Sequence, residues 1–156
     1  MNFILRTANF EDLHRITNLR LKFLQDMGKI KYQEEYRLLY EKNHSYMYDK
    51  MKSDKLIIPF FENGIDNEII SIGIGVILDK PPINMDNLGF EGYIFNVCTD
   101  EKFRKRGYST MILNEIINFF RKKDIKNVTL KSNEKSFELY KKNGFNINNY
   151  YMELTL

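Results

Sequence analysis

The residues best suited to chemistry form a basic turn, Arg104-Lys105-Arg106-Gly107-Tyr108-Ser109. It follows residues 93–99, a short run of aromatic and β-branched residues that predicts a strand. It precedes apolar residues spaced as on one face of a helix, namely Ile112, Leu113, Ile116, Ile117, Phe119 and Phe120. Where a helix begins, backbone N–H groups are unpaired and the helix dipole is positive, so such a turn can bind phosphate.

The turn differs from the common nucleotide loops. It lacks the Gly-Lys-Ser/Thr ending of nucleotide triphosphatases, and its single glycine, Gly107, does not make a dinucleotide fingerprint. Gly107 would let a ligand approach the backbone closely, and the small Ser109 would not block it. Taken alone, the turn indicates an anion site of unspecified kind, with a solvated surface turn as the alternative.

Bulk properties limit the classes of protein. A chain of 156 residues with 43% hydrophobic and 29% charged residues predicts one globular domain, residues 1–156, around one core. The lone Cys98 excludes an internal disulfide and a multi-cysteine zinc site, which favours a reducing compartment. No signal-peptide core or membrane-spanning run is evident, so we expect a cytoplasmic protein with no membrane partner. The net charge of +3 suits a small anionic ligand and is too mild to indicate nucleic acid.

The remaining pattern predicts an α/β order of elements. Strands are expected at residues 3–6, 56–62, 68–78, 93–99, 127–131 and 150–156, and helices at 10–27, 32–51, from about 108 onward, and after Asn133. Pro59 points to an edge strand or a bulge, and Gly73 and Gly75 to a bulge or a close backbone approach. Asn9 and Asn133 are expected to cap helices, and Gly144 to end one with Phe145 folded back on Tyr140. The first helix should bury Leu13, Ile16, Leu24 and Met27.

Two segments carry a family resemblance. The basic turn resembles motif A of the GNAT superfamily of N-acetyltransferases, Gln/Arg-x-x-Gly-x-Gly/Ala, with Ser109 where glycine or alanine is usual. Residues 132–145, Ser-Asn-Glu-Lys-Ser-Phe-Glu-Leu-Tyr-Lys-Lys-Asn-Gly-Phe, resemble motif B. The two lie in the superfamily's order, roughly 25 residues apart, and together they are far more specific than either one. The strong resemblance covers residues 91–145, and the first half matches only in the order of its elements.

The resemblance implies a fold and a cosubstrate. The fold would be an α/β (α+β) mixed sheet, splayed and mostly antiparallel, of about six to seven strands flanked by about four helices. Acetyl-coenzyme A would lie where the strands ending near Thr99 and Lys131 part, with its pyrophosphate on the turn and no metal required. The residues assigned to it by resemblance are Val97, Cys98, Thr99, Arg104, Lys105, Arg106, Gly107, Tyr108, Ser109, Thr110, Asn133 and Tyr140.

The resemblance also implies direct acetyl transfer to a primary amine of a small molecule or peptide. By motif position Tyr140 is the candidate acid for the leaving thiolate, although it could serve only to pack on Phe145. Glu91 is the candidate base, acting directly or through water, although it could be a solvated residue at a strand end. Asn133 can bind the cosubstrate and cap its helix. Neither a nucleophilic Cys98 nor a histidine metal site is favoured.

Two other functions stay open. The cleft could sense an acyl-coenzyme A without modifying any acceptor. Less favoured is a nucleic-acid binder that uses the basic residues of 102–106 and 121–126, because its aromatic residues are predicted to be buried rather than interleaved with that surface. Homodimers are common in the superfamily, so the resemblance allows one. The sequence indicates neither the acceptor nor a dimer interface.

Overall fold

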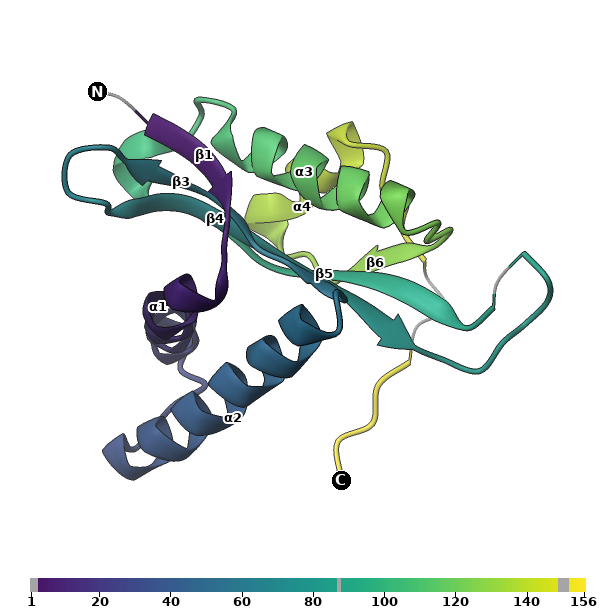
Figure 1. Cartoon of the computed structure of the whole chain (residues 1–156), viewed down its shortest axis with the longest axis horizontal. Coiled ribbons are helices and arrows are strands. Elements are labelled where there is room, and N and C mark those ends of the chain that lie inside the picture. The colour runs from purple at the N-terminus through teal and green to yellow at the C-terminus, as the bar shows by residue number, and fades with distance from the viewer. Residues whose placement is uncertain (1–2, 87, 149–151) are drawn as a thin grey trace.

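A computed structural model describes residues 3–86, 88–148 and 152–156 of the chain (Figure 1). The strands are β1 (Phe3–Thr7), β2 (Leu56–Ile57), β3 (Pro59–Asn63), β4 (Ile69–Asp79), β5 (Phe90–Thr99) and β6 (Val128–Leu130). The α-helices are α1 (Leu13–Asp26), α2 (Gln33–Lys52), α3 (Tyr108–Lys122) and α4 (Glu134–Lys142). Two short 3-10 helices, η1 (Phe10–Asp12) and η2 (Glu101–Phe103), precede α1 and α3.

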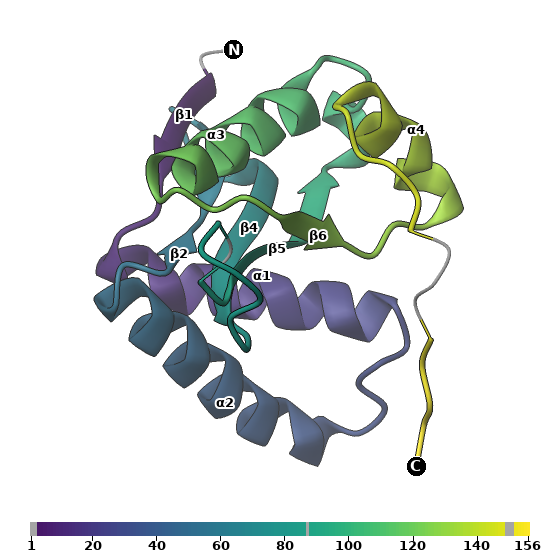
Figure 2. The ribbon, with the colours of Figure 1, turned by 90° about the vertical axis from the view of Figure 1, so that its right-hand side faces the viewer.

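The strands form one mixed sheet in the order β1-β3-β4-β5-β6, with β2 paired to β4. Every pairing is antiparallel except β5 with β6, which is parallel. Helices α1 and α2 lie on one face of the sheet and α3 and α4 on the other (Figures 1 and 2). The predicted fold class is therefore confirmed: a mostly antiparallel mixed sheet of six strands with four α-helices, counted over the described residues.

Each face of the sheet has its own core. Toward α1 and α2 the buried residues are Leu13, Ile16, Met47, Leu56, Ile58, Phe60, Ile72, Ile74 and Val76. Toward α3 and α4 they are Phe61, Ile70, Ile77, Ile94, Ile112, Leu113, Ile116, Phe120 and Tyr140. The expected close approach at two glycines is confirmed: a Cβ at Gly73 would stand 2.6 Å from Ile112, and one at Gly75 2.4 Å from Ile116. These glycines seat α3 directly on β4, which fixes where the basic turn lies.

The predicted helix signals are present. The Asn9 side chain accepts the backbone N–H of Glu11 at 2.9 Å, and the Asp12 carboxylate accepts the backbone N–H of Asn9 at 3.0 Å, so the cap is reciprocal. Asn133 caps α4 by accepting the backbone N–H of Ser136 at 3.0 Å. After α4, Gly144 takes a left-handed φ of 88°, and the rings of Tyr140 and Phe145 meet edge to face at 5.9 Å.

Two expectations about the first half of the chain are wrong in part. Pro59 does not mark an edge, because β3 lies between β1 and β4; the chain instead breaks before Pro59, and a register shift follows at Phe61 and Glu62. Met27 is 53% exposed, because α1 ends at Asp26 and Met27 turns outward beside the left-handed Gly28.

The predicted last strand, residues 150–156, is not formed by the part that the structure describes. Residues 152–156 lie in no strand, and residues 150 and 151 are outside the described residues. The apolar side chains of Met152, Leu154 and Leu156 are exposed. The neighbouring edge strand, β6, is three residues long, so it offers few ladder hydrogen bonds to a further strand. No helix in the described ranges has the length and apolar character needed to cross a bilayer.

Candidate active site

The sheet parts between β5 and β6. The two strands pair only from Gly92 to Ile94 on β5, opposite Val128 to Leu130 on β6. On its other side β5 stays paired to β4 as far as Thr99. In the described structure, residues 95–99 therefore keep a backbone edge that β6 does not cover, and such an edge can pair with an extended ligand as a further strand would.

A bulge in β5 lies at this parting. Ile72 faces Cys98 and Ile74 faces Phe95, so β5 carries one residue more than β4 between these pairs. Asn96 takes a left-handed φ of 54°, which is uncommon for a residue other than glycine. A bulge bends a strand and increases its local twist, so it helps to separate β5 from β6. The bulge predicted at Gly73 is therefore confirmed as a register shift at this point, but the sequence did not indicate that the extra residue lies on β5.

The basic turn joins η2 to α3. Lys105 and Gly107 both have a positive φ, of 61° and 84°. Gly107 is the N-cap residue of α3 and has no side chain to satisfy the first N–H groups of the helix, which also lack intrahelical partners. A Cβ built on Gly107 would meet no atom within 4 Å. The N-cap residue of α3 therefore leaves the first backbone N–H groups of the helix without a side-chain cap, and such groups can bind an anion.

The side chains of the turn are already partly engaged. Arg104 donates from Nε to the carbonyl of Thr99 at 3.1 Å and from Nη1 to Glu101 at 2.8 Å. The ring of Tyr108 packs against Phe3 and Phe61 at centroid distances of 5.7 and 4.8 Å. Since Glu101 offsets part of the charge, the oriented backbone N–H groups are the better-placed anion ligands.

A chain of hydroxyl groups ties the turn to the sheet. Thr99 Oγ1 lies 2.8 Å from Ser71 Oγ and 2.7 Å from Ser109 Oγ. Ser71 also donates to the carbonyl of Cys98 at 3.2 Å. The hydroxyl of Ser109 thus has a structural use that glycine or alanine would not provide, because it links the first turn of α3 to the end of β5.

A cavity of about 730 Å³ opens between β5, β6 and α4 and brings Glu91, Tyr93 and Tyr140 together. Tyr140 is 7% exposed, and its ring packs on Phe145. Its hydroxyl has no hydrogen-bond partner within the described residues. Every fully buried side-chain oxygen in those residues has a partner, so the Tyr140 hydroxyl is not fully buried and reaches open space. Burial, with smaller effects of Cys98 and Tyr93, raises the pKa of the phenol. Tyr140 therefore stays protonated at neutral pH and can donate a hydrogen bond into the cavity.

The carboxylate of Glu91 is held by two partners. Lys80, from the loop after β4, donates to Oε2 at 2.5 Å, and Thr129, on β6, donates to Oε1 at 2.8 Å. The side chain is 17% exposed. Each oxygen keeps a second lone pair, so the fixed carboxylate can still accept a hydrogen bond from water or an amine.

Cys98 and Asn133 are two further residues that the resemblance assigned to the site, and their surroundings limit what they can do. Cys98 is half-buried, and burial raises the pKa of its thiol to about 11, with Arg104 acting in the opposite direction. A thiol that stays protonated is a poor nucleophile. The side-chain oxygen of Asn133 is taken up by the cap of α4. Among the residues that the structure covers, no group of three or more His, Cys, Asp or Glu side chains could hold a metal ion.

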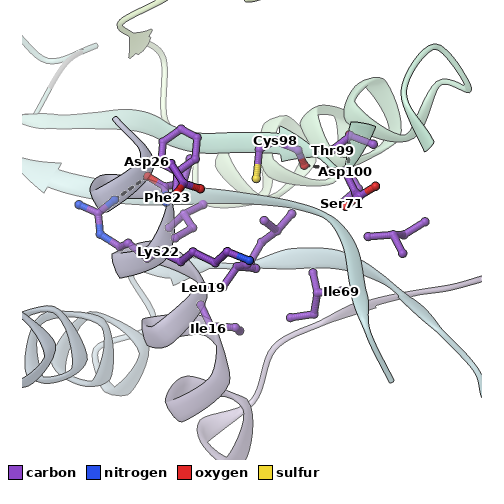
Figure 3. Close-up of a pocket in the computed structure, with 15 residues that line it drawn as sticks. Ile16, Leu19, Lys22, Phe23, Asp26, Ile69, Ser71, Cys98, Thr99 and Asp100 are labelled. Atoms are coloured by element: carbon purple, nitrogen blue, oxygen red, sulfur yellow. Dashed lines mark hydrogen bonds between the residues drawn. The ribbon is translucent and has the colours of Figure 1, made fainter. Parts of the chain in front are cut away.

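A second cavity of about 190 Å³ lies between α1 and the strands β4 and β5. Figure 3 shows Ile16, Leu19 and Phe23 of α1 on one side of it and Cys98 and Thr99 of β5 on the other. Arg20 also lines it, and sequence reasoning did not single out this residue. The available signal was its position: Arg20 follows Leu13 by seven residues and Ile16 by four, so a charge falls on the apolar face of the helix.

The parted mixed sheet, the exposed edge of β5 and the start of α3 beside it form the arrangement that the resemblance to N-acetyltransferases predicts. The model of the acetyltransferase (GNAT) family matches residues 14–145. The chain belongs to this family, whose members are acyltransferases. Nothing among the curated proteins matches the chain.

Solved structures agree on the fold. A predicted acetyltransferase from Clostridium acetobutylicum, solved with acetyl-coenzyme A, is 25% identical, with a TM-score of 0.86 over 99% of this chain and 96% of its own. Glucosamine-6-phosphate N-acetyltransferase from Arabidopsis thaliana is 15% identical, with a TM-score of 0.73 over 99% of both chains. An aminoglycoside acetyltransferase from an uncultured soil metagenomic sample is also 15% identical, with a TM-score of 0.71 over 100% of this chain and 99% of its own.

Proposed function

We propose that this protein transfers an acetyl group from acetyl-coenzyme A directly to a primary amine of a small molecule or peptide. The observation that carries the proposal is the parting of β5 and β6, with the open hydroxyl of Tyr140 in the cavity beside it. The Clostridium acetobutylicum structure with acetyl-coenzyme A supports the choice of cosubstrate. We also predict that the chain forms one domain and is cytoplasmic, and the resemblance allows a homodimer.

The residues fit acetyl-coenzyme A in three places. The uncovered edge of β5 at Val97, Cys98 and Thr99 offers backbone N–H and C=O groups to the amide-containing arm. The turn of residues 104–110 offers backbone N–H groups and positive charge to the pyrophosphate. Asn133 is the N-cap residue of α4, and its amide nitrogen is available to a ligand while its side-chain oxygen caps the helix.

In the reaction itself the chain has two proton tasks. Acetyl-coenzyme A supplies the acetyl group as a thioester, so the amine forms a C–N bond as the C–S bond breaks. We assign Tyr140 to donate to the leaving sulfur and Glu91 to accept the amine proton through water. Both side chains line the cavity of about 730 Å³, and the phenol is protonated at neutral pH.

Acetyl-coenzyme A should stabilise the folded protein. A ligand at 100 times its Kd that binds only the folded state adds about 2.7 kcal/mol, and for a domain of this size each kcal/mol raises Tm by about 2–4 °C. Thermal unfolding with acetyl-coenzyme A, and with ATP as a phosphate control, measures the shift. Thiol release then screens amines for turnover. No stabilisation at millimolar acetyl-coenzyme A would show that the proposal is wrong, and stabilisation without turnover of any amine would favour a sensor.

The substitution Gly107→Ala should weaken acetyl-coenzyme A binding by about tenfold, the loss of roughly one charge-assisted hydrogen bond. The added methyl group would occupy the open space at the start of α3, and φ of 84° is unfavourable for alanine. Gly28→Ala is the matched control, since Gly28 also has a positive φ, of 68°, and no atom within 4 Å of a built Cβ. Calorimetric titration gives the two Kd values. Equal affinities of the two variants for acetyl-coenzyme A would show that the turn is not part of the binding site.

A further inference from the structure

Arg20 of α1 is a half-buried cation held by neutral groups. Its Nε donates to Asn43 Oδ1 at 2.6 Å and its Nη1 to Asn96 Oδ1 at 2.5 Å. Its guanidinium lies over the ring of Phe95, 4.9 Å from the centroid. None of the ion pairs within the described residues involves Arg20, although Arg15 on the same helix binds two carboxylates. A desolvated charge without an opposite charge is costly, and burial accordingly lowers the pKa of Arg20.

The guanidinium still has donors to offer. Of its five N–H groups, Asn43 and Asn96 accept only two. In the part of the chain that is described, Nη2 of Arg20 has no acceptor. Every fully buried side-chain nitrogen in that part does have a partner, so Nη2 is not fully buried. Nη2 therefore reaches open space, and Arg20 lines the cavity of about 190 Å³ between α1 and β5. The two asparagines fix the orientation of the fork and leave its free edge for a ligand.

We propose that Arg20 binds a carboxylate on the amine acceptor, so that the substrate is an amino acid or another small amine that carries a carboxylate. This inference rests on the proposed function. The cavity is lined by Asn96, Cys98 and Thr99, the stretch of β5 beside which the thioester would lie under that function. A guanidinium binds a carboxylate through two parallel N–H···O hydrogen bonds, which orients the acceptor as well as attracting it.

The surroundings favour a carboxylate over a phosphate. Asp26 and Asp100 line the same cavity, with Lys22 as the only other basic side chain among its lining residues (Figure 3). A dianionic phosphate would be repelled by these two carboxylates more strongly than a monoanion. The cavity is also smaller than the 300–1,000 Å³ of typical sites for drug-sized ligands. A compact acceptor fits it better than a large polyamine.

The test compares acceptors that differ only in charge. L-amino acids and their α-amides are offered with saturating acetyl-coenzyme A, and kcat and KM are measured for each pair. We expect kcat/KM to favour the acid by about tenfold or more in the wild type. Arg20→Gln should abolish that preference by raising KM for the acid, while KM for the amide and for acetyl-coenzyme A stays unchanged. Arg20→Lys should restore part of the preference for the acid, and the exposed control Arg37→Gln should leave that preference unchanged.

Two further measurements decide the remaining outcomes. O-phosphoethanolamine is compared with ethanolamine, and a preference for the phosphorylated amine that needs Arg20 would contradict the carboxylate. Thermal shifts with coenzyme A plus N-acetyl-L-amino acids, or their amides, report product binding even where no acceptor turns over. The inference is wrong if the acid is favoured in neither turnover nor product binding. Turnover of amines without that preference overturns this inference alone, whereas lack of acetyl-coenzyme A binding overturns the proposed function.

Discussion

Replacing Tyr140 by phenylalanine should lower kcat by about 10²- to 10⁴-fold, the usual contribution of a positioned acid. The ring packs on Phe145, and phenylalanine would preserve that contact. What is lost is the hydroxyl, which has no partner in the described structure and opens into the cavity shared with Glu91. The fold and the affinity for acetyl-coenzyme A should therefore change little while turnover falls.

The measurements are kcat from thiol release, Kd from calorimetric titration and Tm. Tyr48→Phe is the matched control, since Tyr48 lies on α2 and is 42% exposed. The pH profile adds a check: an acid is active while protonated, and burial raises the pKa of Tyr140 above the ordinary tyrosine value of about 10. The wild type should lose no activity through this group below that pH. An unchanged kcat in Tyr140→Phe would show that Tyr140 packs against its neighbours and has no role as an acid.

Local signals predicted the second half of the chain well. Asn133 acts on the nearby Ser136 and Phe145 on the nearby Tyr140, so the cap and the C-terminal contact of α4 could each be predicted from local spacing. Gly107 likewise marks the start of α3 because a left-handed N-cap favours glycine. Both motifs of the candidate site are local in this sense.

Features that depend on distant partners were missed. The bulge in β5 exists only relative to the register of β4: Gly73 on β4 indicated an irregularity, but no residue type indicated that the extra residue would lie at Asn96. The position of Pro59 depends on which strands pair on either side of β3. Arg20 could be noticed on an apolar helix face, but its lack of an acidic partner follows from the placement of Asn43 and Asn96, 23 and 76 residues away.

The substitution Glu62→Gln should lower the free energy of unfolding by about 2–4 kcal/mol, because it leaves charges uncompensated at a nearly buried site. Glu62 accepts from Arg6 and from Arg15, each at 2.6 Å, and both arginines also bind Asp12. The two acidic side chains are 9% and 7% exposed, the arginines about a third. Glutamine has the shape of glutamate but no charge. The guanidinium groups of Arg6 and Arg15, which lie over the ring of Phe60, would then share only the carboxylate of Asp12.

Urea unfolding measures this loss, with Glu41→Gln as the control. Glu41 also pairs with an arginine, Arg37, but on the surface of α2, so its substitution should cost less than about 0.5 kcal/mol. Equal effects of the two substitutions would show that the buried pairs set the geometry of α1 without adding stability.

The pH dependence gives an independent check with a fixed sign. Hydrogen bonding from Arg6 lowers the pKa of Asp12 to about 2, and despite burial the same arginines lower that of Glu62. A lowered folded-state pKa gives stability that is present above the ordinary carboxyl value near 3.9 and is lost as the pH falls toward 2. The gap between wild type and Glu62→Gln should therefore narrow as the pH falls below the ordinary glutamate value of 4.5, because protonation of Glu62 removes the same charge as the substitution. Because these ion pairs join α1 to β1 and β3, the same loss should loosen the helix that presents Arg20 to its cavity.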